Sequence, residues 1–416
     1  MSPPARPWPL SFTLYRGMTG LLSGHLSRMA LRRHGAMGAS PERGPERLGQ
    51  AGIERPEGPL VWINAASLGE VRAAQAVIGA LGPVNTLLTT TTKTGAARAA
   101  STLPPTGFHQ YAPLDTGAAM GRFLGHWRPD LAIFIESEVP MRAVDRLAVV
   151  GTPMAWMNVR PSRTRARFPG LFAAAMDRMA LITAQDRATE AELRALGMRD
   201  AAFGGTFDLK AMAPPPLADR DALAAIRSAL GDRPAWLVVS AHPDEAAVLA
   251  EAHRQVRAAR PGAALILVPR HPERSDAFLS ALSDLTVGRR SLGDLPDGDV
   301  YLADTFGEAG TFLTAAPFAV IGGTFAEIGG HSPAEAIAMG RPILHGPSTG
   351  AHDAAFAALR ASGAARMARD PAALASMVVD WLGAARASAS EAAARAGASA
   401  RAPLPGLAAR LAALLP

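Results

Sequence analysis

Short apolar runs recur along the chain, and each is followed by a polar or glycine-containing loop and then by an alanine-rich segment. In the first half these runs occupy residues 60–63, 84–88, 131–135 and 154–158. After the first run, apolar residues return at the spacing of one helix face, at Val71, Ala74, Ile78 and Leu81. This alternation of strand and helix predicts an α/β protein, with a parallel sheet covered by helices on both faces.

The alternation stops at a proline-rich segment and then begins again. Residues 214–216 are three consecutive prolines, which form a stiff spacer because proline fits neither a helix interior nor a central strand. Apolar runs resume at residues 236–240, 264–268, 300–302, 318–321 and 342–344. We therefore expect two similar α/β domains, at residues 49–212 and 213–385, and a helical tail at 386–416.

The remaining segment, residues 1–48, carries apolar side chains among basic ones. Arg16 and Arg28 interrupt the apolar residues, so no run reaches the roughly 18 residues that a membrane-spanning helix needs. Pro7 and Pro9 interrupt the apolar core that a signal peptide needs. The pattern favours an amphipathic basic helix that lies on an anionic bilayer. The alternative is an ordinary helix that packs on the following domain.

Composition narrows the class of protein. Of the 416 residues, 49% are hydrophobic and 19% are charged, which excludes a disordered or fibrous protein. The absence of cysteine excludes a disulfide scaffold, a thiolate nucleophile and a cysteine-ligated metal.

The charge is basic and unevenly distributed. The net charge of +6 points to an anionic partner, which would be a nucleic acid, a membrane surface or a phosphorylated substrate. Residues 1–50 hold seven arginines against two glutamates, a net charge of +5. Only Lys93 and Lys210 are lysines, and an arginine-rich genome composition explains the total equally well.

Candidate chemistry follows the apolar runs, because ligands of open parallel sheets bind beyond the carboxyl ends of the strands. Ser67-Leu68-Gly69-Glu70 follows the first run. Ser67 is placed to cap the next helix, with Glu70 three residues later. One interpretation is a capping box, in which both side chains bind backbone amides. The other is that Glu70 is a general base facing a cleft.

Two carboxylates follow the run at residues 131–135. Glu136 and Glu138 share one face if the strand continues, and like charges repel, so at least one needs a partner or a function. The alternative to a function is an ion pair with an arginine such as Arg142 or Arg160.

In the second half, two loops suit an anion. Arg270 and His271 follow a strand between prolines, an arrangement that suits a phosphate, although a solvated loop is the alternative. Residues 322–335 form a glycine-rich turn that leads through Pro333 into a helix, where free amides attract an anion. Glu335 lies one turn inside that helix, placed to accept hydrogen bonds from sugar hydroxyls; a purely structural turn is the alternative. Residues 304–308 form a similar loop.

Several familiar motifs are missing. No G-x-G-x-x-G follows the first strand, which weakens a dinucleotide oxidoreductase, and no G-x-x-x-x-G-K-[ST] indicates a P-loop NTPase. No G-x-S-x-G indicates a hydrolase. The histidines lack ligand spacing, so nothing in the sequence indicates a required metal.

Taken together, these segments resemble the 3-deoxy-D-manno-octulosonic acid (Kdo) transferase family, whose bacterial members add Kdo to lipid A precursors. The resemblance runs in order through the whole chain. The matching segments are residues 46–49, 62–70, 89–95, 113–115, 136–138, 158–160, 269–274, 304–308, 322–335 and 346–347.

The resemblance implies a GT-B fold, in which two Rossmann-like α/β/α domains face a central cleft, the first binding the acceptor and the second the donor. It implies CMP-Kdo as donor, a lipid A precursor as acceptor and inversion at the anomeric carbon, with no metal, no cofactor and no nucleic acid. It places the protein on the cytoplasmic face of the bacterial inner membrane.

The family's catalytic base matches Glu70 and its second catalytic carboxylate matches Glu138. The donor-binding residues carried over are Pro269, Arg270, Gly307, Glu308, Ala309, Ser332, Pro333, Ala334 and Glu335. The acceptor contacts we expect are Ser67, Gly69, Thr94, Arg160 and Arg163, the two arginines from their charge.

Some positions depart from the family. Asn64 stands where the family has His, Ser332 where it has Asn, and Val139-Pro140 where it has Trp. The family also carries Lys in a G-N-L-K-like segment near the linker. Here Asp208 takes the matching place and Lys210 lies two residues further on.

These residues predict a mechanism. Glu70, projecting into a gap between two lobes, would take the proton from the attacking hydroxyl, a step worth roughly 10²–10⁴-fold in rate. Arg270 and the amides around Gly307 and Ser332 would offset the charge on the departing phosphate. The alternatives are another GT-B glycosyltransferase that uses a UDP-sugar, and a non-catalytic two-lobed binding protein.

Overall fold

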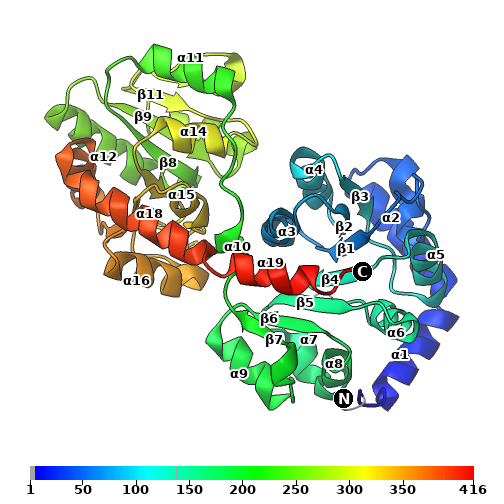
Figure 1. Cartoon of the computed structure of the whole chain (residues 1–416). Coiled ribbons are helices and arrows are strands. Elements are labelled where there is room, and N and C mark those ends of the chain that lie inside the picture. Colours follow the sequence, from blue (N-terminus) through cyan, green and yellow to red (C-terminus); the bar gives the residue numbers. More distant parts are fainter. Residues whose placement is uncertain (1–4, 137–138) are drawn as a thin grey trace. The chain divides into compact units, whose positions relative to one another are not determined.

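The computed structural model describes residues 5–136 and 139–416, apart from the side chain of residue 351. The chain divides into two units. The first unit comprises Met1–Ala213 with Ala402–Pro416, and the second comprises Pro214–Arg401 (Figure 1). The expected N-terminal segment therefore belongs to the first unit, and the expected tail at 386–416 is shared between the units.

The first unit is built on a parallel sheet of seven strands in the order β3-β2-β1-β4-β5-β6-β7. Its strands are β1 Leu60–Asn64, β2 Asn85–Thr90, β3 Gly107–Tyr111, β4 Leu131–Ile135, β5 Met154–Val159, β6 Leu181–Ala184 and β7 Phe203–Thr206. Strand β1 is paired with both β2 and β4, and all of its residues are buried. A central strand that reads as a continuous apolar run is what burial on both faces requires.

Helices cover both faces of this sheet (Figure 1). They are α1 Leu10–Leu21, α2 Ser23–Ala36, η1 Pro41–Leu48, α3 Leu68–Leu81, α4 Lys93–Thr102, α5 Gly117–Trp127, α6 Met141–Val150, α7 Arg163–Arg167, α8 Pro169–Met176, α9 Arg187–Ala195, η2 Asp200–Ala202, α10 Leu209–Met212 and α19 Leu404–Ala412. Successive residues of β1 point to opposite faces: Leu60 and Trp62 join one buried cluster, Val61 and Ile63 another. Leu407 and Leu411 of α19 belong to the second cluster, which explains why the end of the chain returns to the first unit.

The second unit repeats the architecture, with strand order β10-β11-β9-β8-β12-β13-β14. The strands are β8 Ala235–Ala241, β9 Ala264–Pro269, β10 Val287–Arg289, β11 Val300–Leu302, β12 Ala319–Ile321, β13 Ile343–His345 and β14 Ala365–Met367. The helices are α11 Arg220–Leu230, η3 Pro243–Glu245, α12 Ala246–Ala259, η4 Pro272–Arg274, α13 Asp276–Leu279, η5 Arg290–Leu292, α14 Ala309–Ala315, α15 Ala334–Ala338, η6 Gly350–His352, α16 Asp353–Ala361, α17 Pro371–Leu382, η7 Ala384–Arg386 and α18 Ala387–Arg401. The predicted α/β class and the two parallel sheets are thus confirmed.

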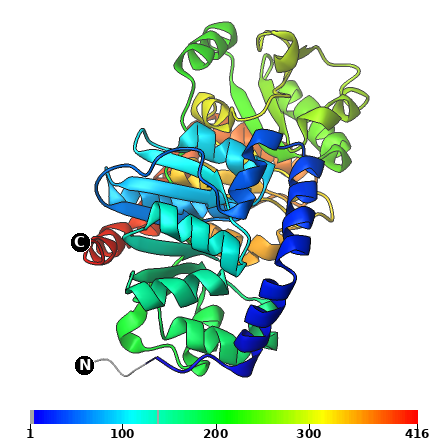
Figure 2. The same cartoon turned by 90° about the vertical axis from the view of Figure 1, so that its right-hand side faces the viewer.

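The N-terminal segment forms α1, α2 and η1, which follow one another along the surface of the first unit (Figure 2). Phe12 of α1 is buried in the core cluster around Trp62, with Trp8 and Tyr15 packed against it. The structure therefore has helices packed on the domain, which is the alternative that the sequence left open. Among the described residues, no helix is both long enough and apolar enough to span a membrane.

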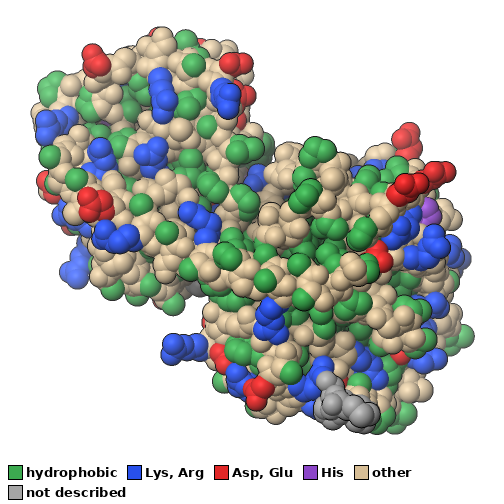
Figure 3. Space-filling view, in the orientation of Figure 1, with side chains coloured by type: hydrophobic (Ala, Val, Ile, Leu, Met, Phe, Trp, Pro, Cys, Tyr) green, Lys and Arg blue, Asp and Glu red, His purple; other side chains and the backbone are tan. Residues whose placement is uncertain are grey.

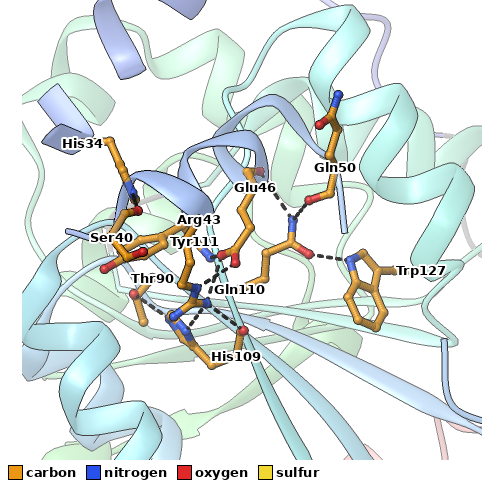
Figure 4. Close-up of polar contacts among 10 residues, drawn as sticks. All are labelled: His34, Ser40, Arg43, Glu46, Gln50, Thr90, His109, Gln110, Tyr111 and Trp127. Carbon is orange, nitrogen blue, oxygen red and sulfur yellow. Dashed lines mark hydrogen bonds and ion pairs between the residues drawn. The ribbon is translucent and has the colours of Figure 1, made fainter. Parts of the chain in front are cut away.

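A polar cluster attaches this segment to the edge strand β3 (Figure 4). The guanidinium of Arg43 donates to both carboxylate oxygens of Glu46 and to Nδ1 of His109. Glu46 Oε2 also accepts from the backbone N–H of Tyr111, at 2.6 Å. Gly49 ends η1 with φ +80°, and a Cβ there would lie 1.9 Å from the carbonyl oxygen of Ala119, so only glycine fits.

Candidate active site

The carboxyl edge of the first sheet holds Glu70. Ser67 caps helix α3, and its hydroxyl accepts from the backbone N–H of Glu70 at 3.5 Å. The Glu70 carboxylate is buried, accepting from the N–H of Ala66 at 2.7 Å and from the Ser67 hydroxyl at 3.2 Å. The Ser67 half of the expected capping box is present, while the Glu70 carboxylate binds the N–H of Ala66. These hydrogen bonds hold the carboxylate in one orientation, and its role as a general base stays a prediction.

Glu136 is the second carboxylate at this edge. It follows β4 with φ +60°, a left-handed conformation that a non-glycine residue adopts at a cost of about 1–3 kcal/mol, and such strain gathers at functional sites. Its side chain is 4% exposed and pairs with Lys210 Nζ at 2.5 Å and with Arg160 at 3.1 Å. The ion pair with Arg160 is one of the two that the sequence offered.

Asn158 joins this group, also in the left-handed region with φ +55°. Its Nδ2 donates to Glu136 at 3.4 Å, while its Oδ1 accepts from the N–H of Leu209 at 2.9 Å. The second bond fixes the start of the short helix α10, which carries Lys210. Asn158 therefore connects the end of β5 to the segment that brings the lysine to Glu136.

Lys210 also lies beside the first turn of α3. A Cβ built on Gly69 would lie 3.4 Å from Lys210 Nζ. The lysine ammonium is therefore adjacent both to the residue before Glu70 and to Glu136. The structure brings Lys210 into the group of residues around Glu70, although it is displaced by two positions from the lysine that the family resemblance suggested.

The other expected acceptor contacts lie further out. Thr94 is exposed in the first turn of α4, and Arg163 is exposed at the start of α7. Arg160 is half exposed beyond its contact with Glu136. Glu138 lies outside the described residues, so its expected role stays a prediction.

The carboxyl edge of the second sheet is organised by a residue that the sequence analysis missed. Glu245 is fully buried, and its carboxylate accepts from the N–H groups of His242, Gly323 and Phe325 at 2.7–3.0 Å. The first of these follows β8 and the other two lie in the glycine-rich turn after β12. One carboxylate thus ties two loops together through backbone donors.

Histidines gather beside these loops. Nε2 of His242 lies 2.7 Å from Nε2 of His331, with the two rings stacked at 5.0 Å. The ring of His271, after β9, lies 5.8 Å from His242. Burial, reinforced by the charge of Arg270, lowers the pKa of His331 to about 4, and burial also lowers the pKa of His242. At neutral pH the pair shares hydrogen bonds without charge, beside the exposed guanidinium of Arg270.

The remaining donor residues lie on two further loops of the same edge. Glu308 accepts two hydrogen bonds from Arg290, the largest cause of a lowered Glu308 pKa, and one from Thr305. It is followed by Ala309 at the start of α14 and preceded by the exposed Gly307, whose φ is +86°. Pairing with Arg290 makes Glu308 a member of an internal ion pair.

The loop after β12 carries the last four of these residues. Ser332 is exposed and its hydroxyl accepts from the N–H of Ala334, at 3.3 Å. Pro333 is buried and precedes α15, and Glu335 is half-buried in the first turn of that helix. The predicted glycine-rich turn into a helix therefore exists, and its residues share the carboxyl edge with Arg270, which follows β9.

Comparison with known proteins places this arrangement in a family. The domain family described as "3-Deoxy-D-manno-octulosonic-acid transferase (kdotransferase)" matches residues 42–213. A 3-deoxy-D-manno-octulosonic acid transferase of Bordetella pertussis is 36% identical over 81% of this chain and 82% of its own length. One of Haemophilus influenzae is 31% identical over 72% of this chain and 73% of its own.

The chain belongs to the Kdo transferase family. It is therefore a glycosyltransferase, and the resemblance read from the sequence is confirmed. A protein with a different name and low sequence identity has a similar fold. A crystal structure of UDP-GlcNAc 2-epimerase from Neisseria meningitidis, bound to UDP-GlcNAc, superposes with a TM-score of 0.58 over 85% of this chain and all of its own, at 11% identity.

Within this Kdo transferase, the residues that sequence reasoning missed had a readable signal. His242 and Glu245 follow the apolar run at 236–240, as Ser67 and Glu70 follow the first run. Applying the same rule to both halves would have found them, because His242 and Glu245 form the reciprocal contacts of a capping box. Nothing local indicated that Glu245 would also reach the turn after β12.

Proposed function

We propose that this Kdo transferase moves Kdo from CMP-Kdo to a hydroxyl of a lipid A precursor, with inversion at the anomeric carbon and without a metal. The observation that carries the proposal is the family relationship, 36% identity over 81% of the chain, together with Glu70 and Arg270 at the carboxyl edges of their sheets. A nucleotide-activated sugar and a sugar hydroxyl both suit such edges.

In this proposal Glu70 is the general base. Its carboxylate is already oriented by the Ala66 N–H and the Ser67 hydroxyl, so little reorganisation is needed to accept a proton from the attacking oxygen. Lys210, beside Gly69 and bound to Glu136, supplies a positive charge close to the developing carboxylic acid. That charge would also attract an anionic group of the acceptor.

On the donor side, the departing CMP gains negative charge on its phosphate. Arg270 at the end of β9 and the backbone N–H groups near Gly307 and Ser332 are the groups that would offset it. The uncharged pair of His242 and His331 lies beside Arg270 and offers hydrogen bonds to the same phosphate. Glu335 would bind ribose hydroxyls.

We also propose that the enzyme works at the cytoplasmic face of the bacterial inner membrane. Helix α1 exposes Leu10, Leu14, Met18 and Leu21, with exposed fractions of 59–88%. These residues form one stripe at a spacing of three to four, opposite the buried face around Phe12, and exposed apolar stripes of this kind mark interaction surfaces. Basic side chains occur on both units (Figure 3), which suits an anionic membrane.

The decisive experiment is incubation of the purified chain with CMP-Kdo and a tetraacylated lipid A precursor, with product masses measured. Addition of one or more Kdo units is expected. Heat protection by CMP but not by UDP is expected as well, and protection by UDP alone would favour a UDP-sugar donor. Absence of any Kdo adduct with a folded, CMP-binding protein would overturn the proposal.

A further inference from the structure

A cavity of about 610 Å³ lies within the first unit, at the carboxyl edge of its sheet. Its wall includes residues that follow five neighbouring strands: Asn64 ends β1, Thr91 follows β2, Leu114 follows β3, Met141 follows β4 and Ser162 follows β5. The cavity therefore opens at the same edge as Glu70. Its lining residues do not include Glu70, Glu136 or Lys210. Asn64, three residues before Ser67, is the link between them.

The deep wall of this cavity is apolar. It is formed by Trp62, Met120 and Phe172 from the buried core, with Leu114 and Leu171 half-buried nearer the rim. Aromatic and aliphatic side chains of this kind offer dispersion contacts to a hydrocarbon and few hydrogen bonds to a sugar.

Two of the polar groups in the wall, Tyr15 and Asp115, are hydrogen-bonded to each other. The Tyr15 hydroxyl donates to Asp115 Oδ2 at 2.6 Å, and the same carboxylate accepts from the backbone N–H of Arg142 at 3.1 Å. Burial raises the pKa of both Tyr15 and Asp115. The hydrogen-bonding groups of this pair are therefore satisfied within the wall, and the apolar side chains beside them suit an apolar ligand.

Helix α1 connects the cavity to the exposed stripe. Ser11 and Tyr15 line the cavity. Leu14 and Met18 lie one turn after them, at the adjoining position on the helix surface, and are 59% and 60% exposed. An apolar surface thus continues from the outside of α1 to the cavity mouth, where Phe168 is 41% exposed. A ligand with one end in a bilayer and the other end at the carboxyl edge of the sheet needs a continuous apolar surface of this kind.

We infer that this cavity binds one fatty-acyl chain of the acceptor, an inference that rests on the proposed function. The chain enters beside α1 and lies against Trp62 and Phe172, and the attached sugar is held near Asn64, toward Glu70. Recognition of a hydrocarbon by burial is worth about fourfold in affinity per methylene group. The cavity therefore makes the acyl chain, and not only the sugar and phosphate, part of what the enzyme recognises.

The test narrows the cavity without touching the proposed catalytic groups. Leu171→Trp places a larger side chain on the rim, and Val150→Trp, on an exposed position of α6 outside the cavity wall, is the matched control. The substrates are a series of acceptors with progressively shorter acyl chains and a fully deacylated acceptor. We expect Leu171→Trp to raise KM for the long-chain acceptor about tenfold and to leave KM for CMP-Kdo and for the deacylated acceptor unchanged.

A direct measurement separates this inference from the proposed function. A fluorescent fatty acid, cis-parinaric acid, should bind the wild type and the control, and should bind Leu171→Trp about tenfold more weakly. Should Leu171→Trp fail to fold, Phe168→Ala at the exposed mouth takes its place, with an expected three- to fivefold weaker binding. Equal binding by all variants, or equal loss for acylated and deacylated acceptors, would overturn the acyl-chain site. Loss of Kdo transfer by the wild type, with fatty-acid binding intact, would overturn only the proposed function.

Discussion

The two carboxyl edges of this molecule use buried glutamates in different ways. At the first edge, Glu136 is paired with the side chains of Lys210 and Arg160. At the second, the partners of Glu245 within residues 5–136 and 139–416 are three backbone N–H groups rather than cations. A glutamate that binds side chains holds charges which a substrate can draw on, whereas one that binds backbone fixes the shape of loops. Glu136 thus holds charged side chains at the first edge, and Glu245 fixes the geometry of loops at the second.

The histidines follow the same division. At the second edge His242 and His331 are hydrogen-bonded to each other and carry lowered pKa values, so Arg270 supplies the permanent charge there. The first edge has Lys210 next to Gly69, the residue that precedes the proposed base. In the proposed reaction, the charge of Lys210 at the first edge would affect the proton transfer to Glu70. Arg270 at the second edge would bind the phosphate of the donor.

The largest expected effect concerns Glu70. Glu70→Gln keeps the size of the side chain and removes the proton acceptor, so transfer should fall by roughly 10²–10⁴-fold. Heat protection by CMP should persist, because the donor residues lie on the other sheet. The control is Glu391→Gln, since Glu391 on α18 is largely exposed. Transfer at wild-type rate by a folded Glu70→Gln protein would show that Glu70 is not the general base.

Glu245→Gln should have the next largest effect, on stability and on the donor together. It weakens three charge-assisted bonds to backbone groups at a fully buried position, so we expect a loss of about 2–4 kcal/mol in the free energy of unfolding. CMP protection should weaken with it, because two of these bonds fix the glycine-rich turn. Denaturant unfolding measures the loss, with Glu251→Gln on the exposed side of α12 as control. A change below 0.5 kcal/mol would contradict the proposed role in fixing the loops.

Lys210→Met removes the charge of Lys210 and tests how much that charge contributes at the first edge. Glu136 keeps Arg160, so the expected loss of stability is smaller, about 1–2 kcal/mol, than for a buried carboxylate left wholly unpaired. We expect kcat to fall at least tenfold with KM for CMP-Kdo unchanged, and Lys210→Arg to restore part of it. A double-mutant cycle with Glu136→Gln measures the coupling between the two side chains. Additive effects would show that the ion pair is not what places the lysine.

The sequence predicted most of the inner strands of the two sheets but not the outermost strands. Strands β4 and β11 have the predicted bounds, because a strand buried on both faces reads as an uninterrupted apolar run. Strand β3 was missed because it contains His109 and Gln110. These polar side chains are satisfied by partners far along the chain: Trp127 donates to Gln110, and Arg43 donates to His109.

In the candidate site, too, the sequence predicted some contacts and missed others. Ser67 and Glu70 were found because their contacts are local, three residues apart on one helix terminus. The approach of Lys210 to Gly69 and the contact of Glu245 with Gly323 could not be found, since each joins segments that are distant in the chain. Lys210 follows β7 and Gly69 follows β1, whereas Glu245 and Gly323 follow β8 and β12, which are neighbours in their sheet. Sequence spacing reveals contacts within one loop, and sheet order decides contacts between loops.

The remaining expected effect is on acid stability, and it compares the two units directly. Each has a histidine whose pKa burial lowers to about 4 and whose Nδ1 accepts a hydrogen bond: the half-buried His109 in the first unit and the buried His253 in the second. Nδ1 of His109 accepts from Arg43, and Nδ1 of His253 accepts from the Trp236 indole, so a proton on either nitrogen would break a bond.

The sign of the pH effect follows from these shifts. An unfolded histidine has a pKa near 6.5 and takes up its proton below that value, while the folded one resists protonation until about pH 4. Stability is therefore complete above pH 6.5 and falls as the pH is lowered toward 4, by up to about 1.4 kcal/mol per pH unit for each group. His109→Gln should make this decline less steep for the first unit, and His253→Gln should do so for the second. Urea unfolding between pH 7 and pH 5 measures the slopes, and an unchanged slope in both variants would show that other groups control the acid limb.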